Sequence, residues 1–275
     1  MNKTMRKTIA LMIVIMFAFC ASVCAEEAEN DWQNILLLGG DSRSEDNYER
    51  TDSMIILSVN AAQGKVKMCS IMRDTLVEYP GLDRWGKINA AYVRGGLDVA
   101  LATVNHAFDM DITDYVMINM HDMVELVDLF GGIDIEVTER ERSQIKQLDH
   151  SGLVHLNGQQ ALSYSRIRMI DNDYHRVMRQ QNVLLALAEK AQNMEFDDLL
   201  GMTDAVMEHI QTNLDVEQMK ELALMGLSME IKEISQYRIP ADGTFESGMY
   251  ENAWLIKPDF EENSRLLHEF IYENE

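Results

Sequence analysis

Arginine is concentrated in one stretch of this otherwise acidic chain. Guanidinium groups bind phosphate oxygens in a bidentate manner and stay charged at every relevant pH. The stretch therefore predicts an anion site, with weak surface ion pairing to the many carboxylates as the alternative for each single arginine. Eleven of the fourteen arginines fall between residues 43 and 179: Arg43, Arg50, Arg73, Arg84, Arg94, Arg140, Arg142, Arg166, Arg168, Arg176 and Arg179.

Two aspartates flank one loop between apolar segments that have the character of strands. Asp41 and Arg43 follow the apolar run that ends at Gly40, and Asp52 follows Arg50 just before the next run. If both carboxylates lie at strand ends, they can converge on Mg²⁺, with phosphate and water oxygens as further ligands. Ordinary capping of the loop is the alternative, because aspartate is common in turns.

Further charged residues follow other apolar segments. Arg73 and Asp74 come after the run 65–71, and Arg166 and Arg168 alternate beyond Tyr164. On a helix, residues three and four positions apart share a face, and like charges there are unfavourable unless an anion or carboxylates lie between them. This spacing applies to Arg176, Arg179 and Gln180, and Lys87 and Asp173 add a cation and an acid to the same set of candidates.

The elements that must position these residues alternate between strand-like and helix-like segments. Two adjacent strand candidates are joined by the short link 61–64, which predicts a hairpin and argues against an all-parallel sheet. We expect one mixed α/β domain with helices on both faces of a central sheet. The predicted strands are 35–38, 53–60, 65–71, 115–119, 133–137 and 237–239, and the predicted helices are 97–108, 120–130, 174–192, 196–210, 216–227 and 259–272.

Composition excludes several classes of protein. The 275 residues carry 46 acidic and 24 basic side chains, a formal charge of −22, so we expect no binding to nucleic acid. Hydrophobic residues make up 47% of the chain, which is enough for a packed core. Beyond the N-terminal segment only Cys69 remains, so neither an internal disulfide nor a cysteine-based zinc site is expected there. The sequence has no Walker loop, nucleophile elbow or zinc-protease motif.

The N-terminus has the pattern of an export segment. Lys3, Arg6 and Lys7 precede an uncharged apolar run that ends near Ala25. This pattern predicts either a signal peptide cleaved after Ala25 or an uncleaved membrane anchor over residues 1–25. Residues 26–33 form an acidic linker, and the remainder is expected outside the cytoplasm.

Taken together in order, the motifs resemble the LytR-CpsA-Psr domain over about residues 32–195. The domain would then occupy 34–275, with the motif-bearing part at about 34–195 and a C-terminal part at about 196–275. Met72 stands where the family usually has proline. His175 stands where the family often has glycine. The matching segments are 34–43 (NILLLGGDSR), 50–54 (RTDSM), 73–74 (RD), 87–92 (KINAAY), 95–96 (GG), 131–133 (GGI), 156–162 (LNGQQAL), 166–168 (RIR) and 176–181 (RVMRQQ).

The resemblance implies an α/β/α sandwich with a central mixed sheet and an apolar pocket for a polyprenyl chain. It also implies a Mg²⁺-dependent phosphotransferase that moves a glycopolymer, teichoic acid or capsule-like, from a polyprenyl pyrophosphate to peptidoglycan outside the membrane. A pyrophosphate hydrolase on the same substrate and a non-catalytic surface regulator that binds lipid-linked glycans are the alternatives.

The resemblance assigns roles residue by residue. Asp41 and Asp52 would bind Mg²⁺. Asp74 and Asp173 are both candidates to accept the proton of the attacking hydroxyl, because they lie close to the arginines in the sequence. The expected catalytic residues are Arg73, Asp74, Arg166, Arg168 and Asp173, and the expected phosphate-binding residues are Arg43, Arg50, Lys87, Arg176, Arg179 and Gln180.

Overall fold

The computed structural model describes residues 32–40, 50–167, 170, 173–194, 196–220, 233–250 and 253–273. The chain forms two compact units. Of the described residues, those up to Met117 and those from Glu233 onward form the first unit, which we call the sheet unit; those from Ile118 to Lys220 form the second, which we call the middle unit. Within the described residues, no helix is both long and apolar enough to cross a membrane. The predicted export segment and the loop 41–49 lie outside the described residues.

The central sheet is mixed. The predicted hairpin is present and excludes an all-parallel sheet. Strand β1 pairs antiparallel with β2 and β2 with β3, whereas β10 runs parallel to β3. Strand β6 crosses the boundary between the units at Met117. The strand order is β10 (Glu233–Ile239), β3 (Lys65–Ile71), β2 (Thr51–Asn60), β1 (Gln33–Gly40), β6 (Asp114–Asn119) and β9 (Gln211–Thr212).

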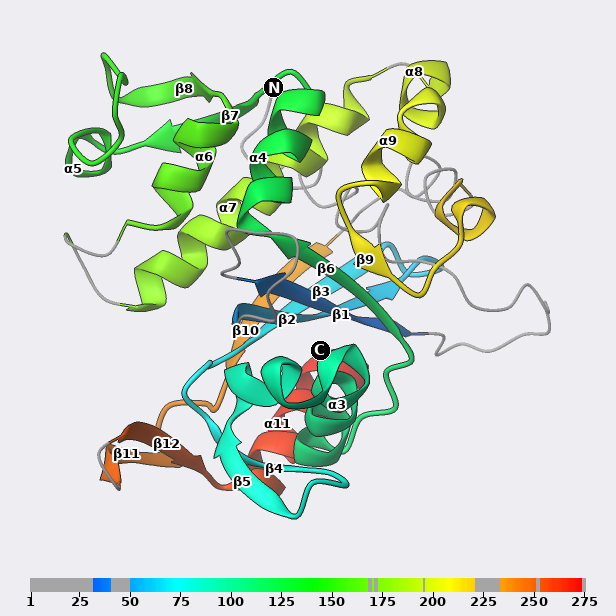
Figure 1. The fold of residues 1–275 in the computed structure, drawn as a ribbon, viewed down its shortest axis with the longest axis vertical. Coiled ribbons are helices and arrows are strands. Elements are labelled where there is room, and N and C mark those ends of the chain that lie inside the picture. The colour runs from blue at the N-terminus through cyan, green and yellow to red at the C-terminus, as the bar shows by residue number, and fades with distance from the viewer. Residues whose placement is uncertain are drawn as a thin grey trace. The chain divides into compact units, whose positions relative to one another are not determined.

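Two helices of the sheet unit pack together, and both lie against the sheet (Figure 1). The long helix α3 (Ala91–Phe108) is interrupted at Gly95 and Gly96, where Gly96 has a φ of 74° that disfavours any side chain. The predicted helix 97–108 is therefore the part of α3 that follows the interruption. The C-terminal helix α11 (Phe260–Tyr272) begins after Asp259, whose side chain accepts a hydrogen bond from the Glu262 N–H and caps the helix.

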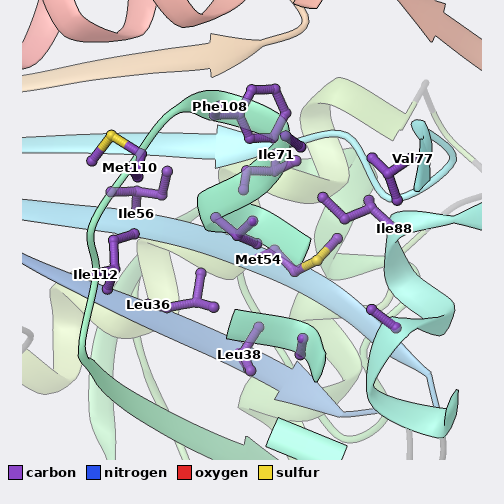
Figure 2. Packing of buried hydrophobic residues seen from close by; sticks show 14 of the residues in the cluster. Leu36, Leu38, Met54, Ile56, Ile71, Val77, Ile88, Phe108, Met110 and Ile112 are labelled. Carbon is purple, nitrogen blue, oxygen red and sulfur yellow. The ribbon is translucent and has the colours of Figure 1, made fainter. Parts of the chain in front are cut away.

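The core of the sheet unit lies between these helices and the strands. Leu36, Leu38 and Ile56 of the strands and Phe108 of α3 belong to one apolar cluster (Figure 2). The last seven residues of β2 are all buried, which explains why its apolar run is nearly continuous rather than alternating. Burial of this apolar surface provides the main stabilisation of the unit.

Two short hairpins complete the sheet unit, and neither is predicted from the sequence. The first is β4 (Leu76–Tyr79) with β5 (Arg84–Lys87), which leads through the 3₁₀ turn η1 (Ile88–Ala90) into α3. The second is β11 (Phe245–Tyr250) with β12 (Ala253–Pro258). It is attached to the segment just before β4 by the Ile256 N–H, which donates to the Asp74 carbonyl at 3.0 Å.

The middle unit packs three helices and a hairpin. Helix α7 lies against both α6 and β7, and α6 lies against α4. Close approach of α4 and α6 requires Gly158, because a Cβ there would clash with the Val124 carbonyl. The elements are α4 (Met120–Leu129), β7 (Ile133–Val137), α5 (Glu139–Arg142), β8 (Gly152–Leu156), α6 (Gly158–Ser165), α7 (Asp173–Gln192), α8 (Phe196–Gly201) and α9 (Thr203–Met207).

Most predicted elements occur close to their expected bounds, with one correction. The single helix predicted at 196–210 is wrong: the structure has the two short helices α8 and α9, of which α8 ends at Gly201 and α9 begins after Met202. Glycine has a high entropic cost inside a helix, so it favours this break. Of the helix predicted at 216–227, residues 216–220 are helical and the remainder lies outside the described residues.

Candidate functional site

Five polar side chains of the sheet unit meet where strands end, and we call them the charge cluster. Asp52 lies at the start of β2, and the Arg73–Asp74 pair follows the end of β3. Lys87 ends β5 and Asn89 lies in η1. The unpredicted hairpin β4–β5 and the turn η1 that follows it thus supply one residue each. The charge cluster consists of Asp52, Arg73, Asp74, Lys87 and Asn89.

Cations and carboxylates alternate in this cluster. Arg73 Nη1 donates to Asp52 Oδ2 at 2.8 Å, and Arg73 Nε lies 3.5 Å from Asp74 Oδ2. Lys87 Nζ donates to Asp74 Oδ1. Asn89 Nδ2 donates to Asp52 Oδ1 at 3.1 Å. The two positive and two negative charges of the cluster balance formally. An incoming phosphate group can replace the carboxylates as the partner of Arg73 and Lys87.

Backbone hydrogen bonds fix the segments that carry the cluster. The Ile88 N–H donates to the Thr75 carbonyl at 2.8 Å, and the Asn89 N–H donates to the Arg73 carbonyl at 3.3 Å. These two bonds tie η1 to the turn that follows β3. A rigid backbone holds charged groups in place before a ligand arrives, which is what electrostatic stabilisation of a transition state requires.

The charge cluster offers oxygen donors of the kind that Mg²⁺ prefers, but fewer than a complete metal site needs. Asp52 and Asp74 offer carboxylate oxygens, and Asn89 Oδ1 is buried with no hydrogen-bond partner in the described part of the chain. Mg²⁺ prefers oxygen ligands and usually keeps several waters or phosphate oxygens. No group of three or more His, Cys, Asp or Glu side chains that could hold a metal occurs among the described residues. The cluster alone is thus a partial site, and the predicted ligand Asp41 lies outside the described residues.

Several predicted site residues are placed only in part. Arg43 and Arg168, like Asp41, lie outside the described residues. Asp173 is the first residue of α7, and its side chain is not described. Arg50 is exposed and directly precedes β2. The roles expected for these five residues stay predictions.

Two of the predicted arginines of the middle unit, Arg176 and Arg179, are buried, and Arg179 is held by protein groups. Arg179 is 3% exposed; its Nη1 donates to Glu141 Oε1 at 3.2 Å and its Nη2 to the Ile167 carbonyl at 3.1 Å. Arg176, one turn earlier on α7, is also buried. Gln180 follows Arg179 and is partly exposed, and Arg166 lies directly after α6. Glu141 is not among the residues predicted from the sequence, although Thr138 and Glu141 have the spacing of a capping box, which they form.

Comparison with known proteins identifies the family. The LytR_cpsA_psr family model matches residues 7–266. The chain belongs to this family. A relative from Bacillus anthracis, named polyisoprenyl-teichoic acid–peptidoglycan teichoic acid transferase TagU, is 35% identical over 215 residues, which cover 76% of this chain and 69% of the relative. A protein of the same name from Halalkalibacterium halodurans is 34% identical over 231 residues, covering 83% and 75% of the two chains.

Solved structures of family members have the same fold. Bacillus subtilis TagV superposes with a TM-score of 0.73 at 26% identity, covering 90% of this chain and all of TagV. TagT with bound octaprenyl pyrophosphate lipid superposes with a TM-score of 0.69 at 22% identity, covering 93% and 96%. The family fold, α/β with a central mixed sheet, is therefore confirmed for this chain.

Proposed function

We propose that this member of the LytR_cpsA_psr family transfers a glycopolymer from a polyprenyl pyrophosphate to a hydroxyl group of peptidoglycan. The observation that carries the proposal is the charge cluster, in which Arg73 and Lys87 lie beside two carboxylates at strand ends. Such a cluster suits a pyrophosphate, and the relatives named TagU are teichoic acid transferases. Teichoic acid is accordingly the first polymer to test.

The proposed reaction is a phosphoryl transfer. The acceptor hydroxyl oxygen forms a bond to the phosphorus nearest the polymer, the bridging P–O bond breaks, and polyprenyl phosphate leaves. Arg73 and Lys87 stabilise the negative charge that grows on the leaving phosphate. Asp74 and Asp173 are the two proposed acceptors of the hydroxyl proton.

The proposed cofactor is Mg²⁺, bound by Asp52 and Asp41. When bound, it would neutralise and orient the pyrophosphate. In the described cluster, Arg73 and Lys87 already balance the charges of Asp52 and Asp74. We therefore propose that the metal binds tightly only together with the pyrophosphate, which brings the missing negative charge.

A single assay separates this function from its rivals. Purified protein is mixed with a polyprenyl-pyrophosphate-linked teichoic acid, with and without peptidoglycan oligomers, and the products are identified by mass spectrometry. We expect a polymer–peptidoglycan phosphodiester and free polyprenyl phosphate only when the acceptor is present. Release of polymer without acceptor would indicate a hydrolase instead, and saturable binding without turnover would indicate a non-catalytic regulator.

The proposed location is the outer face of the cytoplasmic membrane, with residues 1–25 as anchor, or the cell wall after cleavage at Ala25. Lys3, Arg6 and Lys7 before the apolar run support export. Protease added to intact protoplasts should digest the protein while cytosolic controls survive, and protection of the protein would contradict export. The mass of the mature N-terminus decides between anchor and cleaved signal.

A further inference from the structure

Figure 1 shows the hairpin β4–β5, which carries an exposed tryptophan two residues from Lys87 of the charge cluster. The side chain of this residue, Trp85, is 56% exposed. The register of the hairpin places Glu78 opposite Trp85 and Leu76 opposite Lys87. Directly opposite residues of an antiparallel pair share a face, and so do alternate residues of one strand. These four side chains therefore lie on one face of the hairpin.

The other face of the hairpin is turned to the core, so the face of Trp85 is the accessible one. Val77 and Tyr79 of that other face are both buried. The Tyr79 hydroxyl donates to the Lys87 carbonyl at 2.6 Å, and a Cβ at Gly86 would clash with this hydroxyl. These contacts fix the backbone of β5 beside Trp85. A fixed platform lowers the entropic cost of binding a ligand.

Polar groups occupy the positions next to Trp85 on this face. Lys87, which pairs with Asp74, follows along β5 at a strand spacing of roughly 7 Å. Across the hairpin, the Glu78 side chain is 43% exposed, and its Oε2 lies 3.8 Å from His106 Nε2, which is too far for a hydrogen bond. The Glu78 carboxylate is thus accessible to a ligand. An aromatic ring beside an accessible carboxylate suits a sugar, whose C–H groups stack on the ring and whose hydroxyl groups donate to the carboxylate.

A second exposed tryptophan of the sheet unit has different neighbours. Trp254 of β12 is 51% exposed, and the residue directly opposite is Met249, which is 64% exposed. That pair is wholly apolar, whereas Trp85 has a carboxylate opposite. A purely apolar partner on Trp85 would bury the Glu78 carboxylate without a hydrogen bond, which is costly. The neighbours of Trp85 therefore favour a ligand that is rich in hydroxyl groups.

We propose that Trp85 and Glu78 bind the sugar ring of peptidoglycan that carries the attacking hydroxyl group. This inference rests on the proposed function and deepens it by naming the binding site of the acceptor. Lys87 holds Asp74 beside this face, so a sugar stacked on Trp85 can turn a hydroxyl group towards Asp74. As the hydroxyl oxygen bonds to phosphorus and polyprenyl phosphate leaves, the hydroxyl proton passes to Asp74. The inference thus selects Asp74 between the two proposed proton acceptors.

Tryptophan fluorescence tests this inference without turnover. The chain has three tryptophans, and Trp32 is only 9% exposed, so Trp85 is the exposed one in a Trp254→Phe protein. The probe is a soluble peptidoglycan tetrasaccharide of alternating N-acetylglucosamine and N-acetylmuramic acid. We expect it to protect Trp85 from quenching by acrylamide, because a stacked sugar excludes water and quencher from the indole. Quenching that stays unchanged up to the solubility limit of the probe would overturn the proposal.

Variants then locate the site by titration calorimetry with the same tetrasaccharide. Trp85→Ala removes the platform, Trp85→Phe keeps part of it, and Trp254→Ala is the matched control at a similarly exposed tryptophan. We expect Trp85→Ala to bind about tenfold more weakly than wild type, Trp85→Phe to lie between them, and Trp254→Ala to match wild type. Thermal melts check that each variant is folded. Equal affinities of Trp85→Ala and wild type would overturn the proposal, as would an equal loss in Trp254→Ala.

Kinetics and vesicle binding separate the acceptor sugar from two other occupants. In the transfer assay, Trp85→Ala should raise the KM for the peptidoglycan acceptor on the order of tenfold and leave the KM for the lipid-linked donor near the wild-type value. A rise in the donor KM alone would overturn the proposal and assign Trp85 to a sugar of the donor. Weaker binding of Trp85→Ala to phosphatidylglycerol vesicles, with an unchanged affinity for the tetrasaccharide, would overturn it in favour of a membrane surface.

The same measurements distinguish a failure of this inference from a failure of the proposed function. If the tetrasaccharide binds through Trp85 but no transfer product forms, the proposed function fails and the sugar site stands. If transfer proceeds and Trp85→Ala matches Trp254→Ala in affinity and KM, the inference fails and the proposed function stands.

Discussion

Arg73 contacts both carboxylates of the charge cluster, so the planar shape of its guanidinium group matters as much as its charge. Nη1 lies 2.8 Å from Asp52 and Nε lies 3.5 Å from Asp74. A lysine ammonium group is a single point of charge and cannot reproduce this two-sided contact. The geometry of the side chain is therefore open to a test that leaves net charge constant.

We predict that Arg73→Lys lowers transfer activity about ten- to a hundredfold, the value of a lost charge-assisted bidentate contact. The control is Arg265→Lys on α11, an exposed arginine whose partners are Glu262 and Glu269 and which lies outside every family motif. Transfer rate against substrate concentration is measured for both variants together with thermal melts. If Arg73→Lys performs like the control, Arg73 is an ordinary ion-pair residue; if its melting temperature collapses, the loss is structural.

Asp52 is the described residue at which the proposed binding of Mg²⁺ can be tested. Asp52→Asn keeps the shape of the side chain and removes its charge, so we expect Mg²⁺-dependent turnover to fall by about a hundredfold. Asp242→Asn is the matched control, because Asp242 is an exposed aspartate paired with Arg238. Rates are measured across a Mg²⁺ titration. An Asp52→Asn protein with the wild-type rate and the wild-type Mg²⁺ dependence would exclude the metal role.

The contact between Asp52 and Arg73 shows how much of the site can be predicted from the sequence. The β2–β3 hairpin was predicted, and its observed register pairs Ile55 with Ser70. Continuing that register by three residues brings Asp52 opposite Arg73, so the pair follows from a feature that the sequence analysis already had. Asn89 does not follow in this way, because its position depends on the β4–β5 hairpin and the turn after it.

At the scale of elements, prediction succeeded where apolar runs ended at strong breakers. The bounds of β3 and β7 match their predicted ranges, because Gly64 and Gly132 mark their starts. The hairpins β4–β5 and β11–β12 were missed because their strands are short and half exposed, so their hydrophobic pattern is weak. Tertiary contacts, such as the bond from Ile256 to Asp74, decide that these segments are strands.

Glu141 joins two elements of the middle unit. Its Oε2 accepts from the Thr138 N–H and hydroxyl at the start of α5, and its Oε1 accepts from Arg179 of α7. Removing one partner of a buried ion pair leaves the other charge unbalanced, which is far costlier than losing a surface pair. This one carboxylate therefore links α5 to α7.

We predict that Glu141→Ala lowers the free energy of unfolding by about 3 kcal/mol. Glu139→Ala is the control on the same short helix, because Glu139 is exposed and pairs with Arg142 at the surface; we expect it to change stability little. Urea denaturation of both variants measures the difference. Equal stabilities would show that Arg179 does not depend on Glu141, and Arg179 would then be free for the phosphate role predicted from the sequence.

At the scale of the whole molecule, both units bury tyrosine hydroxyl groups. Burial disfavours the charged phenolate and is the largest cause of a raised pKa at each of these positions. Hydrogen bonds from neighbouring side chains have a smaller effect and lower the pKa. Asn34 donates to the Tyr272 hydroxyl at 2.8 Å, and Asn182 donates to the Tyr164 hydroxyl at 3.0 Å. The tyrosines with a raised pKa are Tyr79, Tyr115, Tyr164, Tyr237 and Tyr272.

These raised pKa values predict how stability depends on alkaline pH. Above the ordinary tyrosine pKa of about 10 the unfolded chain loses its phenolic protons, while the folded chain keeps those of the buried tyrosines. The folded state then binds more protons than the unfolded state, so the free energy of unfolding falls as pH rises. The stabilisation is fully present below about pH 10 and is lost progressively above it.

Urea denaturation at a series of pH values between about 8 and 11 measures this loss, and near-ultraviolet absorbance of phenolate reports the titration itself. We expect a steady fall in unfolding free energy above about pH 10, with a fraction of the tyrosines ionising only as the protein unfolds. Tyr164→Phe removes one buried hydroxyl from the middle unit, and its stability should fall less steeply with pH than that of wild type. A pH-independent stability across this range, or free titration of all tyrosines in the folded protein, would contradict the burial of these side chains.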